Sequence, residues 1–238
     1  MKALILNSGI GSRMGEETEH HPKCMTKISK NETILSRQLK YLSELNINEV
    51  IITTGRFDEI LIDYCKKLNL PIKFVFVKNF LYEKTNYIYS IYCAREELND
   101  DIILMHGDLV YSKSVLKDTI NNKYSCMIVS STVPLPQKDF KAVVEDEKIK
   151  KIGVEFFDNA LSAQPLYKLK KSDWRIWLEK IVEYCERNER NCYAENAFNE
   201  ISNRCIVYPL DIKNKLCMEI DDLSDLKTVK EKLKNNEE

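Results

Sequence analysis

A glycine-containing loop near the N-terminus combines backbone N–H donors with basic side chains. The loop spans positions 7–13, directly after the apolar run Ala3 to Leu6, and a further basic residue stands at position 23. Glycine lets the backbone turn so that N–H groups approach an anion closely, and the basic side chains supply positive charge. The segment is therefore a predicted site for phosphate groups. Its candidate contacts are Asn7, Ser8, Gly9, Gly11, Ser12, Arg13 and Lys23.

Carboxylates near the ends of two later apolar runs have the chemistry of a divalent-cation site. Asp108 follows the run 102–105 after His106 and Gly107, while Glu219 and Asp221 alternate along a predicted strand and so share one face. Carboxylates in such places can hold Mg²⁺ against a triphosphate. An aspartate at a strand end is also a common turn former, and Asp221 could cap the last helix. Spacing alone leaves both interpretations open.

Two familiar glycine motifs do not fit the N-terminal loop. A Walker loop requires Lys followed by Ser or Thr after its last glycine, but two glutamates follow Gly15. A dinucleotide fingerprint requires G-x-G-x-x-G, and the three glycines here are one residue out of step with it. The segment instead reads G-x-G-x-R-[ML], as Gly9 to Met14, followed by Pro22-Lys23.

This pattern resembles the signature of the NTP-transferase (nucleotidyltransferase) family, and within it the small bacterial cytidylyltransferases of the phosphocholine type. The resemblance covers nearly the whole chain, with its specific motifs at positions 7–27, 86–90, 107–108 and 219–221. It implies a Rossmann-like fold, Mg²⁺ as cofactor, and transfer of CMP from CTP to a small phosphorylated or phosphonate acceptor, with release of pyrophosphate. The family usually has two small residues where this chain has Asn7-Ser8.

The resemblance also assigns roles to particular side chains. It implies that Asp108 and Asp221 are metal ligands, with Glu219 as a further candidate, and that Arg13 and Lys23 offset phosphate charge during catalysis. An Asn-x-x-x-Ser stretch is similar to the segment that borders the pyrimidine in these enzymes. The further nucleotide contacts that this implies are Asn86 and Ser90, although a residue here could equally cap a helix.

The implied reaction needs no general base, because an acceptor phosphate or phosphonate oxygen is already ionised near neutral pH. Catalysis would rest on alignment and charge neutralisation. Two alternatives stay open on the sequence. One is the same fold acting on a sugar 1-phosphate to make a nucleotide sugar, and the other is a catalytically inactive nucleotide-sensing protein.

Aromatic and acidic residues between positions 164 and 201 are the candidates for recognising the acceptor. Aromatic faces and carboxylates can enclose a positively charged amine, so we expect an acceptor such as phosphocholine or aminoethylphosphonate. Aromatic stripes also build cores, and polar helix faces are often only solvated. The candidate acceptor contacts are Tyr167, Trp174, Glu195 and Glu200.

The elements that must position these residues alternate between strand and helix over the first 132 residues. Five predicted strands and four predicted helices indicate an α/β fold with a doubly wound, mostly parallel sheet. Ligands of such sheets lie at the carboxyl ends of the strands, so the loops after Leu6 and Met105 should share one crevice. The strands are predicted at 2–6, 49–55, 72–77, 102–105 and 125–132, and the helices at 33–45, 58–68, 85–98 and 112–120.

We expect a single nucleotidyltransferase domain over residues 1–238, with a nucleotide-binding core at 1–132, an acceptor-side insertion at 133–204 and a return to the core at 205–238. In the insertion we predict a hairpin at 142–155, a strand at 164–169 and helices at 172–187 and 194–201. The return should add strands at 206–210 and 216–220 to the sheet. A helix starting at Asp222 or Ser224 and a frayed tail at 232–238 should close the chain.

Composition limits the partners. With 36 basic and 37 acidic residues the net charge is −1, which leaves no positive field for a nucleic-acid backbone. The apolar runs are far shorter than the roughly 20 residues that span a bilayer, and the N-terminus enters a strand directly, so a cytoplasmic protein without a membrane partner is expected. A homodimer is compatible with the sequence, which carries no signal for the number of subunits.

Overall fold

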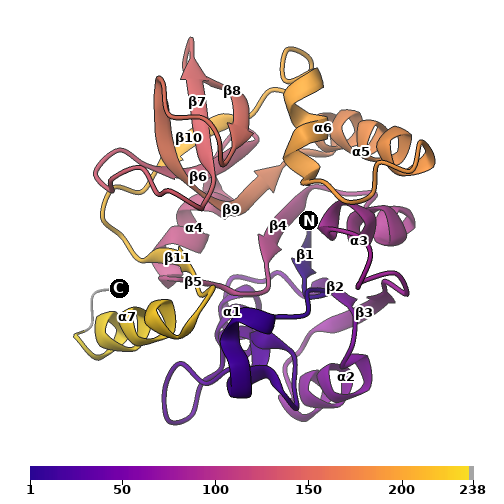
Figure 1. Ribbon diagram of the computed structural model, residues 1–238, viewed down its shortest axis with the longest axis vertical. Coiled ribbons are helices and arrows are strands. Elements are labelled where there is room, and N and C mark those ends of the chain that lie inside the picture. The colour runs from indigo at the N-terminus through magenta and orange to yellow at the C-terminus, as the bar shows by residue number, and fades with distance from the viewer. Residues whose placement is uncertain (236–238) are drawn as a thin grey trace.

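A nine-stranded sheet forms the centre of the computed structural model, which describes residues 1–235 (Figure 1). Its strand order is β10-β6-β9-β4-β1-β2-β3, and β7 and β8 form a hairpin attached through β9. The strands are β1 Lys2–Leu6, β2 Glu49–Thr54, β3 Lys73–Lys78, β4 Ile102–His106, β6 Cys126–Ser130, β7 Lys141–Glu145, β8 Lys148–Gly153, β9 Ala160–Leu169 and β10 Tyr208–Asp211. A second sheet pairs β5 (Leu109–Tyr111) with β11 (Cys217–Glu219).

The prediction of a mostly parallel α/β sheet is confirmed. β1 runs parallel to β2 and β4, β2 to β3, and β6 to β10. The exception at the centre is β9, which lies antiparallel between β4 and β6. Residues 133–204, assigned from the sequence to an insertion, therefore supply an inner strand of the main sheet.

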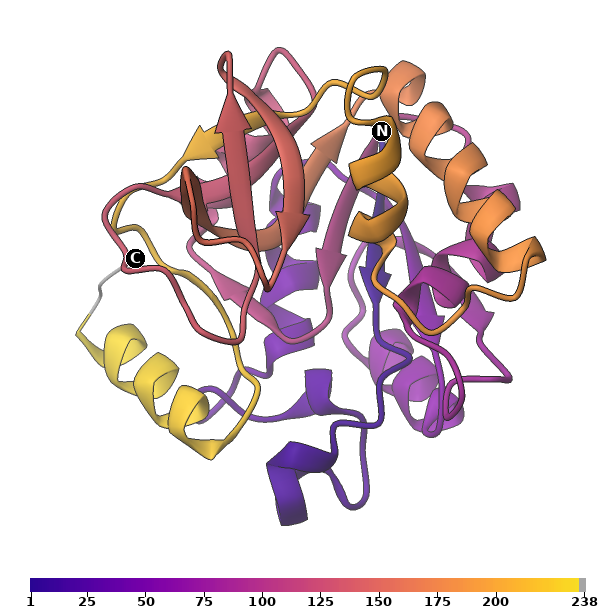
Figure 2. The same ribbon diagram turned by 45° about the horizontal axis from the view of Figure 1, so that its top comes forward.

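Helices cover both faces of this sheet (Figures 1 and 2). Because side chains alternate along a strand, Ala3 and Ile5 of β1 pack on the side of α1, α2 and α4, while Leu4 and Leu6 pack on the side of α3, α5 and α6. The apolar run in β1 is thus buried on both faces, as a central parallel strand requires. The helices are α1 Ile34–Glu44, α2 Asp58–Lys67, α3 Tyr87–Ala94, α4 Lys113–Asn121, α5 Lys171–Glu186, α6 Ala194–Ile201 and α7 Leu223–Lys234.

The observed helix starts match the predicted ones where a neighbouring side chain caps the helix, and differ where a distant residue fixes the start. Asp222 accepts hydrogen bonds from the backbone of the first turn of α7, as expected. The helix predicted to start with Ser172 as its cap starts one residue earlier, at Lys171 after Lys170, so Ser172 lies inside α5 and does not cap it. There the backbone N–H of Lys170 donates to Ser125 Oγ of a distant segment at 2.9 Å, so a tertiary contact fixes this start.

The C-terminal region forms a third, smaller core on the second sheet. Leu226 and Val229 of α7 pack there with Met14 and Ile220. Strand β5 was not predicted from the sequence, and the expectation that residues 216–220 would join the main sheet is wrong, because within residues 1–235 β11 pairs only with β5.

The structure also limits two expectations about the ends and about membranes. The predicted frayed tail is wrong for residues 232–234, which continue α7, and residues 236–238 of that prediction lie outside the described residues.

Among residues 1–235, no helix has both the length and the apolar character needed to cross a membrane.

Gly107 allows the loop after β4 to meet the loop after β1. Its backbone N–H donates to the carbonyl of Leu6 at 3.0 Å. A Cβ atom at this position would lie 1.6 Å from Asn7 Oδ1 and 2.9 Å from the Leu6 carbonyl oxygen. Glycine is therefore required by close packing at the junction of the two loops.

We predict that Gly107→Ala lowers the free energy of unfolding by about 1–3 kcal/mol, because the methyl group must displace Asn7. Urea denaturation measures this change. Gly9→Ala is the matched control, since a Cβ there meets no atom within 4 Å, and its effect should stay below about 0.5 kcal/mol. Equal stabilities for the two variants would contradict the packing argument.

Candidate active site

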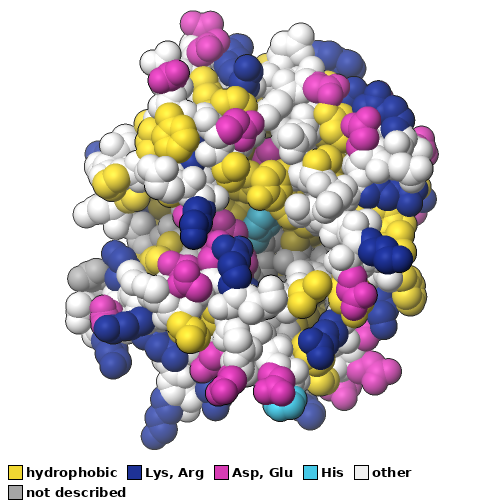
Figure 3. All heavy atoms as spheres, in the orientation of Figure 1, with side chains coloured by type: hydrophobic (Ala, Val, Ile, Leu, Met, Phe, Trp, Pro, Cys, Tyr) yellow, Lys and Arg dark blue, Asp and Glu magenta, His cyan; other side chains and the backbone are white. Residues whose placement is uncertain are grey.

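A cavity of about 570 Å³ lies at the carboxyl ends of β1 and β4, where the sequence placed the shared crevice. Residues of the first loop, of the segment that follows β3 and of the turn after β4 line it together. Figure 3 shows a hollow near the centre of one face, where hydrophobic, acidic and basic side chains and a histidine meet. The expectation of one crevice between the two loops is confirmed.

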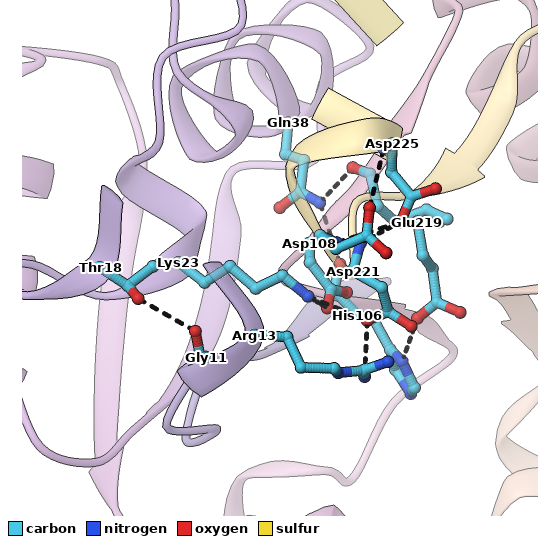
Figure 4. A network of polar contacts seen from close by, with 12 residues as sticks. Gly11, Arg13, Thr18, Lys23, Gln38, His106, Asp108, Glu219, Asp221 and Asp225 are labelled. Carbon is cyan, nitrogen blue, oxygen red and sulfur yellow. Dashed lines mark hydrogen bonds and ion pairs between the residues drawn. The ribbon is translucent and has the colours of Figure 1, made fainter. Parts of the chain in front are cut away.

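Four of the predicted site residues form an ionic cluster in the lining of this cavity (Figure 4). Lys23 Nζ lies 2.6 Å from Asp108 Oδ2 and 3.1 Å from Asp221 Oδ1, and Arg13 Nη2 lies 2.9 Å from the same Asp221 oxygen. Burial disfavours the Lys23 ammonium, but the two carboxylates raise its pKa above the ordinary lysine value. Lys23 is therefore charged at neutral pH, and Arg13 is more than half exposed at the mouth.

The pairing of β5 with β11 brings the carboxylates together. A two-residue turn joins β4 to β5 and contains Asp108, and Glu219 lies opposite Leu109 in the antiparallel ladder. The N–H of Ile220 donates to the Asp108 carbonyl at 3.0 Å. Residues more than 100 positions apart thus meet because of one short ladder.

His106 was named from the sequence only as part of the segment that ends in Asp108, and no role was predicted for it. Its Nδ1 lies 2.8 Å from Glu219 Oε1. Although burial opposes the charged ring, this carboxylate raises the pKa of His106 to about 8, while burial raises the pKa of Glu219 to about 7. The available signal was its place, a histidine at the end of a buried strand two residues before Asp108.

The acidic groups in this cluster have the chemistry of a divalent-metal site. Ligand atoms of His106, Asp108 and Glu219 all lie within 4.8 Å of one another, and Asp221 is joined to Asp108 through Lys23. Magnesium prefers carboxylate oxygens to imidazole nitrogen. The carboxylates therefore fit such an ion, and His106 is better suited to orienting Glu219.

The first loop is shaped by its own hydrogen bonds. Gly11 has a φ of 71°, in the left-handed region that favours glycine, and its carbonyl accepts bonds from Met14 N and Thr18 Oγ1 at 3.1 and 3.0 Å (Figure 4). The buried Met14 anchors the following turn in the third core. Gly9, Ser12 and Arg13 consequently line the cavity.

Two buried polar groups of the first loop lack partners within the described chain. Asn7 Nδ2 and Ser8 Oγ make no hydrogen bond there, although both residues line the cavity. Buried polar groups are nearly always hydrogen-bonded. Where the related family has small residues, this chain therefore presents groups that a bound molecule could satisfy.

The segment after β3 carries the other predicted nucleotide contacts. Asn86 Oδ1 accepts a hydrogen bond from Tyr87 N at 2.7 Å and caps α3, so the capping role considered from the sequence is present. Both Asn86 and Ser90 line the cavity. Asn79, which the sequence analysis did not single out, lines it as well and bonds to Ser90.

An aromatic wall, defined as Tyr87, His106, Phe140 and Tyr193, lines the same cavity and adjoins the ionic cluster, because a ring nitrogen of His106 lies within 4.8 Å of an Asp108 carboxylate oxygen. The ring centroid of Tyr87 lies 4.7 Å from that of His106 and 5.9 Å from that of Tyr193. Phe140 meets Tyr193 edge to face at 5.2 Å. The cavity is thus lined by an ionic cluster and by an aromatic wall that adjoins it.

The predicted acceptor contacts do not form this wall, and these assignments need correction. Trp174 and Tyr167 are buried in the core between α5, α6 and β9. Glu195 is also buried and accepts hydrogen bonds from the hydroxyls of Tyr87 and Tyr167. Glu200 lies at the surface, where it pairs with Lys180 at 2.7 Å.

Known proteins resemble this chain in sequence and in fold. Residues 3–135 match the family model described as MobA-like NTP transferase domain. The CTP:phosphoglutamine cytidylyltransferase of Campylobacter jejuni is 31% identical over 160 residues, which cover 64% of this chain and 62% of that protein. The choline-phosphate cytidylyltransferase of Streptococcus pneumoniae is 25% identical over 99% of both chains. The solved structure of the CTP:phosphocholine cytidylyltransferase from Streptococcus pneumoniae shares the fold, with a TM-score of 0.79, 21% identity and 98% coverage of both chains.

We predict that Lys23→Met tightens binding of Mn²⁺ to the nucleotide-free protein by about tenfold, or roughly 1.4 kcal/mol. The reason is that the ammonium, which lies against both aspartates, no longer competes with the metal ion for them. An electron paramagnetic resonance titration measures free Mn²⁺. Lys30→Met, which changes an exposed lysine, is the control. An unchanged Mn²⁺ affinity in Lys23→Met would show that Lys23 does not compete with the metal ion.

Proposed function

Because this chain belongs to the MobA-like NTP transferase family, we propose that it is a Mg²⁺-dependent cytidylyltransferase that transfers CMP from CTP to a small acceptor. The acceptor carries a phosphate or phosphonate group and a positively charged amine. The observation that carries the proposal is one cavity lined both by an ionic cluster, made of Arg13, Lys23, Asp108 and Asp221, and by the adjoining aromatic wall. The relatives named above, which act on CTP, support the choice of nucleotide.

In the proposed reaction an oxygen of the acceptor phosphate attacks the α-phosphorus of CTP. The new P–O bond forms as the bond to the β-phosphate oxygen breaks, and pyrophosphate leaves with the electron pair. The attacking oxygen is ionised, so the protein has only to align the reactants and offset charge. No side chain is needed to remove a proton.

The ionic cluster supplies these functions. The first loop directs backbone N–H groups toward the phosphates, and Lys23 and Arg13 exchange part of their contact with the aspartates for phosphate oxygens. Asp108, Asp221 and Glu219 would hold Mg²⁺, which neutralises the charge of the triphosphate when it is bound. Charge on the leaving pyrophosphate increases during the reaction, so interactions with Lys23 are strongest in the transition state.

The aromatic wall is the proposed seat of the amine. A cation within about 6 Å of an aromatic ring gains about 0.5–2 kcal/mol, and more than one ring increases the effect. Glu219 lies beside the wall through its bond to His106. Glu195 lies behind it, and its hydrogen bond to the Tyr87 hydroxyl orients that ring. This replaces the acceptor contacts expected from the sequence.

The alternatives make different demands on the same cavity. A sugar 1-phosphate needs neutral hydrogen-bond partners for its hydroxyls, and a nucleotide sensor needs no turnover at all. The decisive experiment is a pyrophosphate-release screen of four nucleoside triphosphates against phosphocholine, phosphoethanolamine, aminoethylphosphonate and sugar 1-phosphates. Preference for a sugar, or CTP binding without turnover, would overturn the proposal.

We predict that Asp108→Ala lowers kcat by about a hundredfold or more, as is usual for groups that organise transition-state charge. Pyrophosphate release under saturating substrates measures the loss. Asp118→Ala removes an exposed aspartate that pairs with Lys215 and should keep the wild-type rate. Retention of more than about a tenth of the activity in Asp108→Ala would show that this carboxylate is not a catalytic ligand.

We predict that Tyr193→Leu raises the KM for an amine-bearing acceptor by about tenfold, or roughly 1.4 kcal/mol, and leaves the KM for CTP unchanged. Leucine keeps an apolar side chain but removes the ring face. Glu200→Gln is the control, because Glu200 lies outside the cavity lining. Should Tyr193→Leu use the acceptor normally, the aromatic wall does not hold the amine.

A further inference from the structure

Asn79 lies directly after β3 and is almost fully buried beside the cavity. Its side chain makes three hydrogen bonds. Oδ1 accepts from Leu81 N at 2.8 Å, and Nδ2 donates to Thr85 Oγ1 and to Ser90 Oγ, each at 3.0 Å. The Asn79 amide thus links Leu81, Thr85 and Ser90, which all lie in the segment that follows β3.

The orientation of this amide follows from its neighbours. The backbone N–H of Leu81 can only donate, so the oxygen of Asn79 must face it. The nitrogen must then face the two hydroxyls, and both of its protons are used there. A flipped amide would place two donors against each other at Leu81.

Each of these hydroxyls accepts a hydrogen bond from Asn79, so each can donate its own proton only to a different acceptor. Thr85 Oγ1 donates to the Leu81 carbonyl at 2.8 Å. Within residues 1–235 the Ser90 hydroxyl has only its bond from Asn79, and Asn79 offers it no acceptor. Since Ser90 lines the cavity and is 1% exposed, its proton remains for a bound molecule.

We propose that Asn79 is a positioning residue that makes the Ser90 hydroxyl an obligatory donor to the nucleotide base, and that this donor favours cytosine over uracil. The inference rests on the proposed function. Cytosine presents two adjacent acceptors, O2 and N3, whereas uracil presents an N–H donor at N3. A donor aimed at N3 is satisfied by cytosine and opposed by the N–H of uracil, whereas O2 accepts in both bases, so the proposed Ser90 contact is to N3. The unpartnered Asn7 Nδ2 lines the same cavity and adds a second buried donor.

The test reverses the polarity of the amide without changing its shape. In Asn79→Asp the carboxylate still accepts from Leu81 N but now takes the proton of Ser90, which leaves only a lone pair facing the base. Calorimetry with CTP and with UTP, without acceptor, measures the ratio of the two dissociation constants. We expect the preference for CTP to fall at least tenfold, and thermal unfolding verifies that the fold is kept.

Ser90→Ala provides the second arm. It should lower the preference for CTP to a similar extent, and in its background Asn79→Asp should change the ratio no further, because the two residues act through one hydroxyl. An equal loss of CTP and UTP affinity in Asn79→Asp, or additive effects in the double variant, would overturn the inference. If the wild-type protein binds CTP and UTP equally, both this inference and the proposed use of CTP are wrong. If the wild-type protein prefers CTP and the variants keep that preference, only the inference about Asn79 is wrong.

Discussion

The contact between Lys23 and the carboxylates of Asp108 and Asp221 is the interaction on which the site depends. It joins the segment after the first loop, the turn after β4 and the residues that precede α7, which are far apart in the sequence. Three charges in a partly buried place are tolerated only because each has partners of opposite sign. Without the ammonium, or another cation in its place, the carboxylates would repel one another.

The small second sheet and the third core hold the residues of this cluster in place. The ladder between β5 and β11 fixes the distance between Asp108 and Glu219, and α7 is held by apolar contacts with Met14 of the first loop. The loop proposed to bind phosphate and the acidic groups are therefore built on one packed unit. This packing supports the alignment on which the proposed reaction, which uses no general base, relies.

Behind the aromatic wall, buried polar groups are satisfied by one another. Two tyrosine hydroxyls donate to the buried Glu195 carboxylate, and burial together with that negative charge raises the pKa of Tyr87. Tyr87 then stacks on Tyr193 and meets His106 edge to face. A carboxylate that seemed suited to contact a ligand instead fixes the ring that lines the cavity.

The sequence by itself determined the alternation of strands and helices, the glycine loop, the cap at Asp222 and the grouping of Arg13, Lys23 and Asp108 near strand ends. These features depend on neighbouring residues, through side-chain periodicity, glycine conformation and capping, so they can be predicted locally. Only the tertiary structure decided that β9 enters the main sheet, that Trp174 is buried while Phe140 and Tyr193 line the cavity, and that His106 binds Glu219. The reason is that burial of a side chain and its long-range partners depend on packing between distant segments, which residue type and spacing do not specify.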